Sequence, residues 1–381
     1  MSARAAKAEK PAPETLDPTQ IEGARHPRDT MILIGQRRAE ADFLDAFTAG
    51  RLHHGWLVTG PRGTGKATLA WRIARFLLTQ PLAAEAGLFG APPPPTSLAT
   101  DPDHPVARRI HAGSEPGVFV LKRGLNASET GLSQDIRVDE VRKLKSFLHL
   151  SSAEGGRRVV IVDAADEMNT QAANALLKLL EEPPERVTFL LISHQPARLL
   201  PTIRSRCREL RLGTLAPEEM AEALADAGEE GAEGQTAALA ALSGGSVGEA
   251  IRLLNLDGLA TYEKLVALFS TLPRLDRVRA LALAESITGK QNEARFDLLL
   301  TLIELFLSRA ARAGLAGPPA LEGAPGEAQL LARLSPDGHA AMKWAALHQS
   351  LGARARHGKA VNLDPAALVM DMVLEMTAAV A

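Results

Sequence analysis

The sequence predicts an α/β domain with a parallel sheet, followed by a region made only of helices. Short apolar segments with strand character occur among the first 212 residues, at 56–58, 118–121, 159–163 and 187–192, and helical patterns lie between them. This alternation is typical of parallel sheets, because each return to a parallel strand needs a long crossover. A Gly-rich loop joins the first strand to its helix, and after Leu212 the strand pattern disappears.

Apolar residues at helical spacing predict the helices of the first part, at 39–47, from Gly65 to about 77, at 136–150 and at 171–181. The last of these must stop at the Pro-Pro pair that follows, because proline cannot continue a helix. Residues 80–115 are rich in Pro, Gly and Ala, which predicts a surface insertion. Residues 1–27 carry almost no large apolar side chains and are expected to form a disordered tail.

The later part of the chain has helical signals only. Residues 214–254 have the pattern of short Ala-rich helices, with Pro217 at a first helical position. From residue 262 onward the pattern is again helical. Asp364 followed by Pro365 marks the start of the last helix, because aspartate is a favoured N-cap and proline is favoured at the next position.

Composition excludes several classes of protein. A chain of 381 residues is long enough for more than one core. The net charge of −2 argues against a protein that holds nucleic acid mainly by a basic field, so proteins are the more probable partners. The single cysteine, Cys207, excludes an internal disulfide and a Cys-rich zinc cluster. Without a long apolar run or a secretory signal pattern, the expected location is the cytoplasm and no membrane partner is expected.

Residues 60–66 (GPRGTGK) match a phosphate-binding loop. Gly60, Gly63 and Gly65 would let backbone N–H groups face a phosphate, and Lys66 would add positive charge. The next residue is Ala67, where a Ser or Thr hydroxyl should hold Mg²⁺, and a methyl group cannot bind a metal. The loop is therefore expected to bind nucleotide weakly or to be vestigial, with its shape retained.

A second acidic motif follows the strand at 159–163. Asp163 stands at the end of this strand, where a parallel sheet presents its ligands. The following residue is Ala164 instead of the Glu that would orient an attacking water. Asp166 and Glu167 are interpreted as acids in the first turn of a helix, a position that needs no catalytic role.

The segment 202–208 (TIRSRCR) carries three arginines. Arginine suits insertion into a neighbouring protein's phosphate site, because its planar fork is always charged and binds phosphate oxygens bidentately. The alternative from these residues alone is a solvated face or a set of ion pairs within the chain.

Taken together, these motifs resemble the clamp-loader branch of the AAA+ superfamily. The similarity runs from GPRGTGKATLA through VVIVDAADEMN to NALLKLLEEPPERVTFLLISHQPARLLPTIRSRC, covers about residues 28–255, and returns weakly near the C-terminus. It is strongest to the family's bacterial subunits in which the phosphate site is degenerate and the Ser-Arg-Cys arginine persists. By this resemblance, Lys66 is the P-loop lysine, Asp163 the metal-binding acid, Ser193 a polar sensor and Arg206 an arginine finger.

The resemblance also implies two further losses. Active subunits place a sensor arginine in a Gly-Ser-x-Arg pattern of the lid, where this chain has Gly248. Many subunits carry four zinc cysteines in the stretch that corresponds to 80–115, where this chain has none. No zinc is therefore expected, and ATP is at most a weak ligand.

The implied architecture has three folded parts after the tail at 1–27. These are a RecA-like AAA+ domain at 28–212 that includes the insertion at 80–115, a helical lid at 213–260, and a helical collar for oligomerisation at 261–381.

The implied function is that of a non-hydrolysing clamp-loader subunit within the DNA polymerase III holoenzyme. Its partners would be the motor subunits gamma or tau and the clamp-opening subunit delta, with the sliding clamp and primer-template DNA reached through the complex. Two alternatives stay open: an active motor ATPase of the same superfamily, including a helicase loader, and a P-loop nucleotide transferase. The first would need the three missing catalytic groups, and the Ser-Arg-Cys motif and helical tail disfavour the second.

Overall fold

The structure is a computed structural model that describes residues 17–19, 24–81, 93–126, 131–150, 156–229, 232 and 234–380. The described chain falls into two compact units. The first contains residues 25–60 and 65–212, together with 17–19. The second contains the helical part from residue 213 onward and also the loop tip at 61–64.

The first unit is built on a five-stranded parallel sheet in the order β2-β3-β4-β1-β5. The strands are β1 (Gly55–Thr59), β2 (Val118–Lys122), β3 (Arg158–Asp163), β4 (Val187–Ser193) and β5 (Arg208–Arg211). Four of them match the predicted strands. The fifth, β5, was not predicted, because only Leu210 of its four residues is buried and an edge strand this polar has no apolar run.

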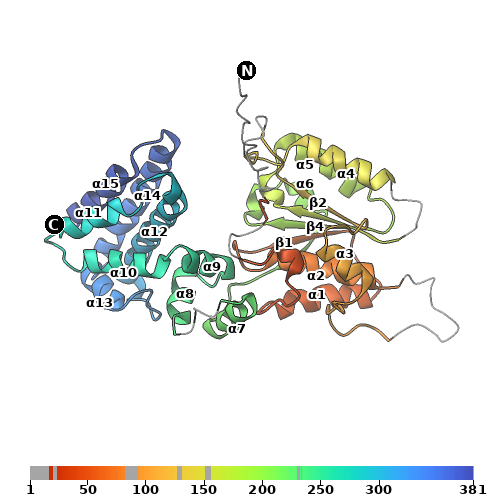
Figure 1. Ribbon diagram of the computed structural model, residues 1–381, viewed down its shortest axis with the longest axis horizontal. Helices are drawn as coiled ribbons and strands as arrows, with labels where there is room; N and C mark the ends of the chain where they lie inside the picture. Colours follow the sequence, from red (N-terminus) through yellow and green to blue (C-terminus); the bar gives the residue numbers. More distant parts are fainter. Residues whose placement is uncertain are drawn as a thin grey trace, which may run out of the picture. The chain divides into compact units, whose positions relative to one another are not determined.

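Helices cover both faces of the sheet. On one face lie α1 (Arg37–Thr48), α2 (Lys66–Thr79) and α3 (Pro105–His111), and on the other lie α4 (Val138–Leu150), α5 (Thr170–Glu181) and α6 (Pro201–Arg204) (Figure 1). Each face has its own core. Within β1, Trp56 and Val58 belong to one core and Leu57 to the other, as the period of two in a strand requires. The expected α/β fold is therefore confirmed.

The expected surface insertion at 80–115 needs correction. Leu98 and Ile110 are buried in the core beside α2, and α3 packs against that helix. His104 Nδ1 accepts a hydrogen bond from the Val106 N–H at 3.2 Å, and Pro105 occupies the first helical position, so this short helix has a well-defined start. The Pro-rich composition led to the prediction of a surface segment, although part of this segment lies in the core. Residues 82–92 of the predicted insertion lie outside the described residues.

Part of the predicted tail at 1–27 is anchored to the first unit. Lys122 Nζ donates to Asp17 at 2.6 Å, and His26 lies 3.4 Å from the same carboxylate. Of the tail, the structure describes only residues 17–19 and 24–27. Asp17 and His26 therefore lie close to Lys122, the last residue of β2.

The second unit is helical throughout its described residues. Its helices are α7 (Pro217–Ala227), α8 (Thr236–Ser243), α9 (Val247–Asn255), α10 (Gly258–Phe269), α11 (Arg277–Glu285), α12 (Glu293–Ala316), α13 (Glu327–Leu334), α14 (Gly338–Ala360) and α15 (Pro365–Ala378). Asp364 caps α15 as predicted, since its carboxylate accepts from the Ala367 N–H at 2.9 Å. The expected boundary at 260 falls inside α10, which packs on both α9 and α12.

A buried polar cluster ties several of these helices together. Glu327 is fully buried at the start of α13, and Arg309 of α12 donates to both of its carboxylate oxygens, at 2.6 and 3.0 Å. The Tyr262 hydroxyl of α10 donates to the same carboxylate at 2.6 Å. Arg309 also donates to the Ala241 carbonyl of α8, at 3.4 Å. The cluster therefore joins the predicted lid segment to the predicted collar segment within this unit.

In the described chain, no single helix is long and apolar enough to cross a membrane; α8 and α9 reach that length and composition only as a pair bent by 113°.

Candidate functional site

The phosphate-binding loop lies where the sequence predicts, between β1 and α2. Lys66 is the first residue of α2 and is only 3% exposed. Its Nζ donates to the Gly60 carbonyl at 2.8 Å, so the ammonium that would bind a phosphate binds its own loop. Ala67 packs against the apolar core beside α2. The position that would supply a metal-binding hydroxyl therefore serves packing.

The tip of the loop packs inside the second unit. The Gly63 carbonyl accepts a hydrogen bond from the Gly248 N–H at 3.2 Å. A Cβ placed on Gly63 would collide with Ser246 Oγ, and the residue has φ of 70°, so only glycine fits there. Ser246 is the N-cap of α9, and its hydroxyl accepts from the Glu249 N–H at 3.1 Å. The glycine at the expected sensor position thus lies against the loop through its backbone.

Asp163 is the one retained acid of the expected metal site. Burial, together with the Glu167 carboxylate, raises the pKa of Asp163 to about 6, although Lys66 and Lys122 oppose the shift. Because Ala67 supplies no hydroxyl, the set of donors for a magnesium-bound nucleotide is incomplete. The residues present fit a magnesium nucleotide poorly.

Ser193 ends β4 and pairs in register with Thr59 of β1. It is fully buried, and within the described part of the chain its hydroxyl has no hydrogen-bond partner. The structure thus brings Ser193 to the same edge of the sheet as the loop and Asp163, as the resemblance implies.

The two acids after Asp163 have structural partners. Asp166 accepts from the His194 and Gln195 N–H groups, both at 3.1 Å, and so holds the chain that follows β4. Glu167 forms an ion pair with Arg123 at 2.8 Å.

Arg206 lies between α6 and β5, at the amino end of the sheet. Its side chain is 36% exposed, its Nη2 lies 2.9 Å from Glu181 Oε1, and its Nη1 donates to the Thr202 carbonyl at 3.0 Å. Cys207 is packed beneath it, and burial raises the pKa of this thiol to about 12. A Cβ on Gly55 would lie 3.1 Å from the Arg206 carbonyl, so the close approach of β1 fixes the backbone here.

Arg206 and the phosphate-binding loop lie at opposite edges of the same sheet. Gly55 opens β1 next to Arg206, and Thr59 closes it next to the loop. Four steps at about 3.3 Å per residue put roughly 13 Å of strand between them. Arg206 therefore cannot serve the loop of its own chain. The sequence identified Arg206 but missed Glu181, because their contact depends on where α5 ends.

The neighbouring arginines differ from Arg206. The Arg208 guanidinium lies over the Trp56 ring, 5.3 Å from its centroid, and belongs to the edge of the sheet. Arg204 is the last residue of α6 and is exposed.

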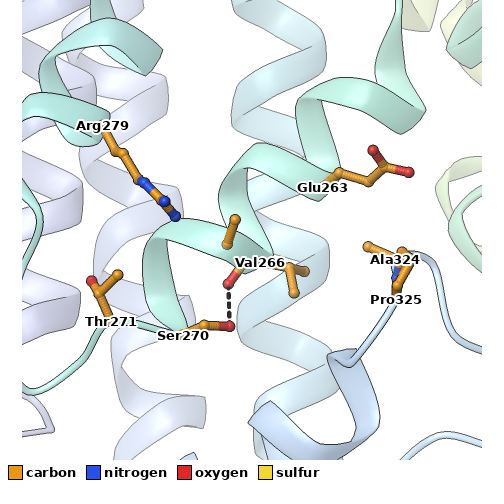
Figure 2. Close-up of a pocket in the computed structure, with 8 residues that line it drawn as sticks. Glu263, Val266, Ser270, Thr271, Arg279, Ala324 and Pro325 are labelled. Atoms are coloured by element: carbon orange, nitrogen blue, oxygen red, sulfur yellow. Dashed lines mark hydrogen bonds between the residues drawn. The ribbon is translucent and has the colours of Figure 1, made fainter.

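A cleft of about 530 Å³ in the second unit offers a second candidate (Figure 2). It is lined by Glu263, Val266, Ala267, Ser270, Thr271, Arg279, Ala324 and Pro325. The Ser270 hydroxyl donates to the Val266 carbonyl at 2.8 Å, and Arg279 pairs with Asp276 at 3.3 Å. Ser270 and Arg279 therefore already have partners within the chain.

The described residues contain no group of three or more His, Cys, Asp or Glu side chains that could hold a metal ion.

Comparison with known proteins identifies the family. The model of the family described as DNA polymerase III, delta subunit, matches residues 35–216. DNA polymerase III subunit delta prime of Pseudomonas aeruginosa is 39% identical over 250 residues, covering 64% of this chain and 68% of that protein. Its counterpart in Escherichia coli is 34% identical over 267 residues, covering 69% and 72%. DNA polymerase III subunit tau of Salmonella typhimurium is 29% identical over 276 residues, covering 70% and 39%. The chain therefore belongs to the DNA polymerase III subunit delta prime family.

Proposed function

We propose that this protein is the non-hydrolysing delta prime subunit of a replicative clamp loader and that it presents Arg206 to ATP bound by the neighbouring motor subunit. The observation that carries the proposal is the position of Arg206. It is a half-exposed arginine about 13 Å of strand away from its own phosphate-binding loop, so its charge can serve only another chain.

The chain's own site supports a non-hydrolysing role. Lys66 is bound to Gly60, the metal-binding hydroxyl is replaced by Ala67, and the glutamate expected after Asp163 is replaced by Ala164. We propose that ATP binds weakly or not at all and that no zinc is needed.

The proposed partners are the motor subunit gamma or tau and the clamp-opening subunit delta. The likeness to a tau subunit supports membership of the same complex, and the two delta prime relatives favour delta prime over a motor role. The sliding clamp and primer-template DNA would be reached through the complex. Because this role serves the chromosome directly, the proposed location is the cytoplasm, with no membrane partner.

The test is reconstitution of the complex with Arg206→Ala, Arg206→Lys and the control Arg204→Ala. Each arginine finger contributes about 10³ to 10⁵ in rate at the site it serves. Sites not served by this subunit keep their turnover, so we expect partial loss of ATPase and a larger loss of clamp loading. Arg206→Lys should behave nearly like Arg206→Ala, because lysine keeps the charge but not the bidentate fork.

Assembly is measured alongside by size-exclusion chromatography. Wild-type loading by Arg206→Ala, or failure of that variant to assemble, would refute the finger assignment. Arg204→Ala should assemble and load at the wild-type rate.

A further inference from the structure

Glu181 and Arg206 meet although 25 positions separate them in the sequence. Glu181 is the last residue of α5, and Arg206 stands in the short turn between α6 and β5. The two side chains come together because α5 ends at the amino edge of the sheet, where Leu180 also packs near Gly55. Their charged atoms are 2.9 Å apart.

The position of Glu181 at the C-terminal end of α5 is electrostatically unfavourable for a carboxylate. A carboxylate in the last turn of a helix faces the negative end of the helix dipole, which disfavours it. Such departures from a local rule are expected mainly at functional sites. The pair is also partly exposed, at 36% and 43% for the two side chains, and ion pairs that water reaches contribute little to folding. Stability alone therefore gives a weak reason for this carboxylate.

The contacts leave most of the guanidinium available. Arginine has five N–H donors, and the contacts to Glu181 and Thr202 need one each on Nη2 and Nη1. Among the described residues, Nε–H and one N–H on each terminal nitrogen have no hydrogen-bond partner, which leaves them for oxygens of a phosphate. Glu181 can therefore hold Arg206 while Arg206 binds a phosphate.

We propose that Glu181 is a positioning residue that orients Arg206 toward the ATP of the neighbouring subunit. This inference rests on the proposed finger role of Arg206. A long, exposed arginine samples many rotamers, and a partner that fixes its direction before assembly lowers the entropy lost when it engages the phosphate. Glu181 acts through Arg206 and touches no nucleotide itself.

The experiment measures ATP turnover of the reconstituted complex on primed DNA with the clamp present. The variants are Glu181→Ala, Glu181→Gln, Arg206→Ala and the double variant Glu181→Ala/Arg206→Ala. Glu182→Ala is the matched control, since Glu182 is the adjacent exposed acid. Thermal unfolding and assembly of each variant are recorded alongside.

We expect Glu181→Ala to lower kcat of the finger-dependent turnover about two- to five-fold, the range that an exposed ion pair can supply. KM for ATP should stay unchanged, because the finger acts in the transition state. Glu181→Gln should recover most of the rate, since its amide oxygen still accepts from Nη2. The double variant should match Arg206→Ala, because Glu181 acts only through that side chain.

The outcomes separate this inference from the proposed function. If Arg206→Ala turns over ATP at the wild-type rate, the finger itself is wrong. If Arg206→Ala is slow but Glu181→Ala equals or exceeds the wild type, the finger stands and the positioning role of Glu181 is refuted. Additive losses in the double variant, or equal losses in Glu182→Ala, would also refute it. If Glu181→Ala unfolds, Glu181→Gln takes its place: a small but measurable loss of kcat is then expected, and a kcat equal to that of the wild type would refute the positioning role.

Discussion

Two cationic side chains of the first unit use their charge in different ways. Lys66 is 3% exposed and donates to its own loop, whereas Arg206 is 36% exposed and keeps N–H groups available. Of these two charges, the one that a second protein can reach is that of Arg206, at the amino edge of the sheet. At the carboxyl edge, Asp163 and Ser193 lie on the same side of the sheet as the loop, which has Ala67 where a metal-binding hydroxyl is expected.

Ser193 gives a stability test of the buried polar groups at this edge of the sheet. Its buried hydroxyl has no partner among the described residues, so it lowers stability by its own desolvation. We expect Ser193→Ala to leave the free energy of unfolding unchanged or to raise it by up to about 1 kcal/mol. The free energy of unfolding is measured by urea unfolding, monitored through the fluorescence of Trp56 and Trp71 in the first unit.

Ser246→Ala is the contrasting variant, because Ser246 caps α9. Loss of a serine N-cap lowers the free energy of unfolding by about 1 kcal/mol. The fluorescence of Trp344 during urea unfolding measures this loss in the second unit. A loss above about 1 kcal/mol for Ser193→Ala would mean that this hydroxyl is bonded in solution.

The motif positions could be predicted from sequence because their meaning depends on spacing along the chain. Gly60, Lys66 and Asp163 occupy the loop and strand end that the pattern required. Glu181 could not be predicted, since an acid at a helix end has the same sequence signal whether or not an arginine from another segment reaches it.

At the scale of elements, apolar runs correctly predicted β1 to β4. The sequence-based prediction failed for two segments in which only some residues are buried. The strand β5 buries one residue of four, and α3 stands in a Pro-rich stretch yet buries Ala107 and Ile110. In both cases the neighbouring element supplies the apolar surface. Local composition therefore underestimates how far these two segments contribute to the core.

The cluster of Glu327, Arg309 and Tyr262 joins elements of the second unit and gives a prediction at this scale. Glu327→Gln should leave the guanidinium of Arg309, whose side chain is 12% exposed, without its counter-charge. Breaking a buried pair in this way costs about 3 to 5 kcal/mol. Chemical unfolding monitored at Trp344 should show the loss.

Arg354→Gln is the control for that measurement. Its ion pair with Asp371 joins α14 to α15, but the two side chains are 44% and 48% exposed. Exposed pairs contribute little to stability, so only a small effect is expected. Equal effects of Glu327→Gln and Arg354→Gln would contradict a stabilising role for the buried cluster.

At the scale of the whole molecule, the missing catalytic groups are distributed over both units. Ala67 and Ala164 lie in the first unit, and Gly248 lies in the second, against the loop tip. In the proposed function each substitution affects a different step, because the three positions would bind the metal, orient water and sense the phosphate. No single reversion restores the set.

The purified protein should therefore show no ATP turnover above background. Positioning of the attacking water by a general base contributes about 10² to 10⁴ in rate, and the metal-binding hydroxyl and lid arginine are missing besides. Ala67→Ser alone should also stay inactive, since Ala164 and Gly248 remain. Steady-state phosphate release measures both proteins, with a hydrolysing motor subunit as the positive control. A turnover of about 1 s⁻¹, typical of working enzymes, that disappears in Lys66→Ala would overturn the non-hydrolysing role. Turnover that survives Lys66→Ala would come from a contaminant, since the loop lysine is the one cation that the motif directs at a phosphate.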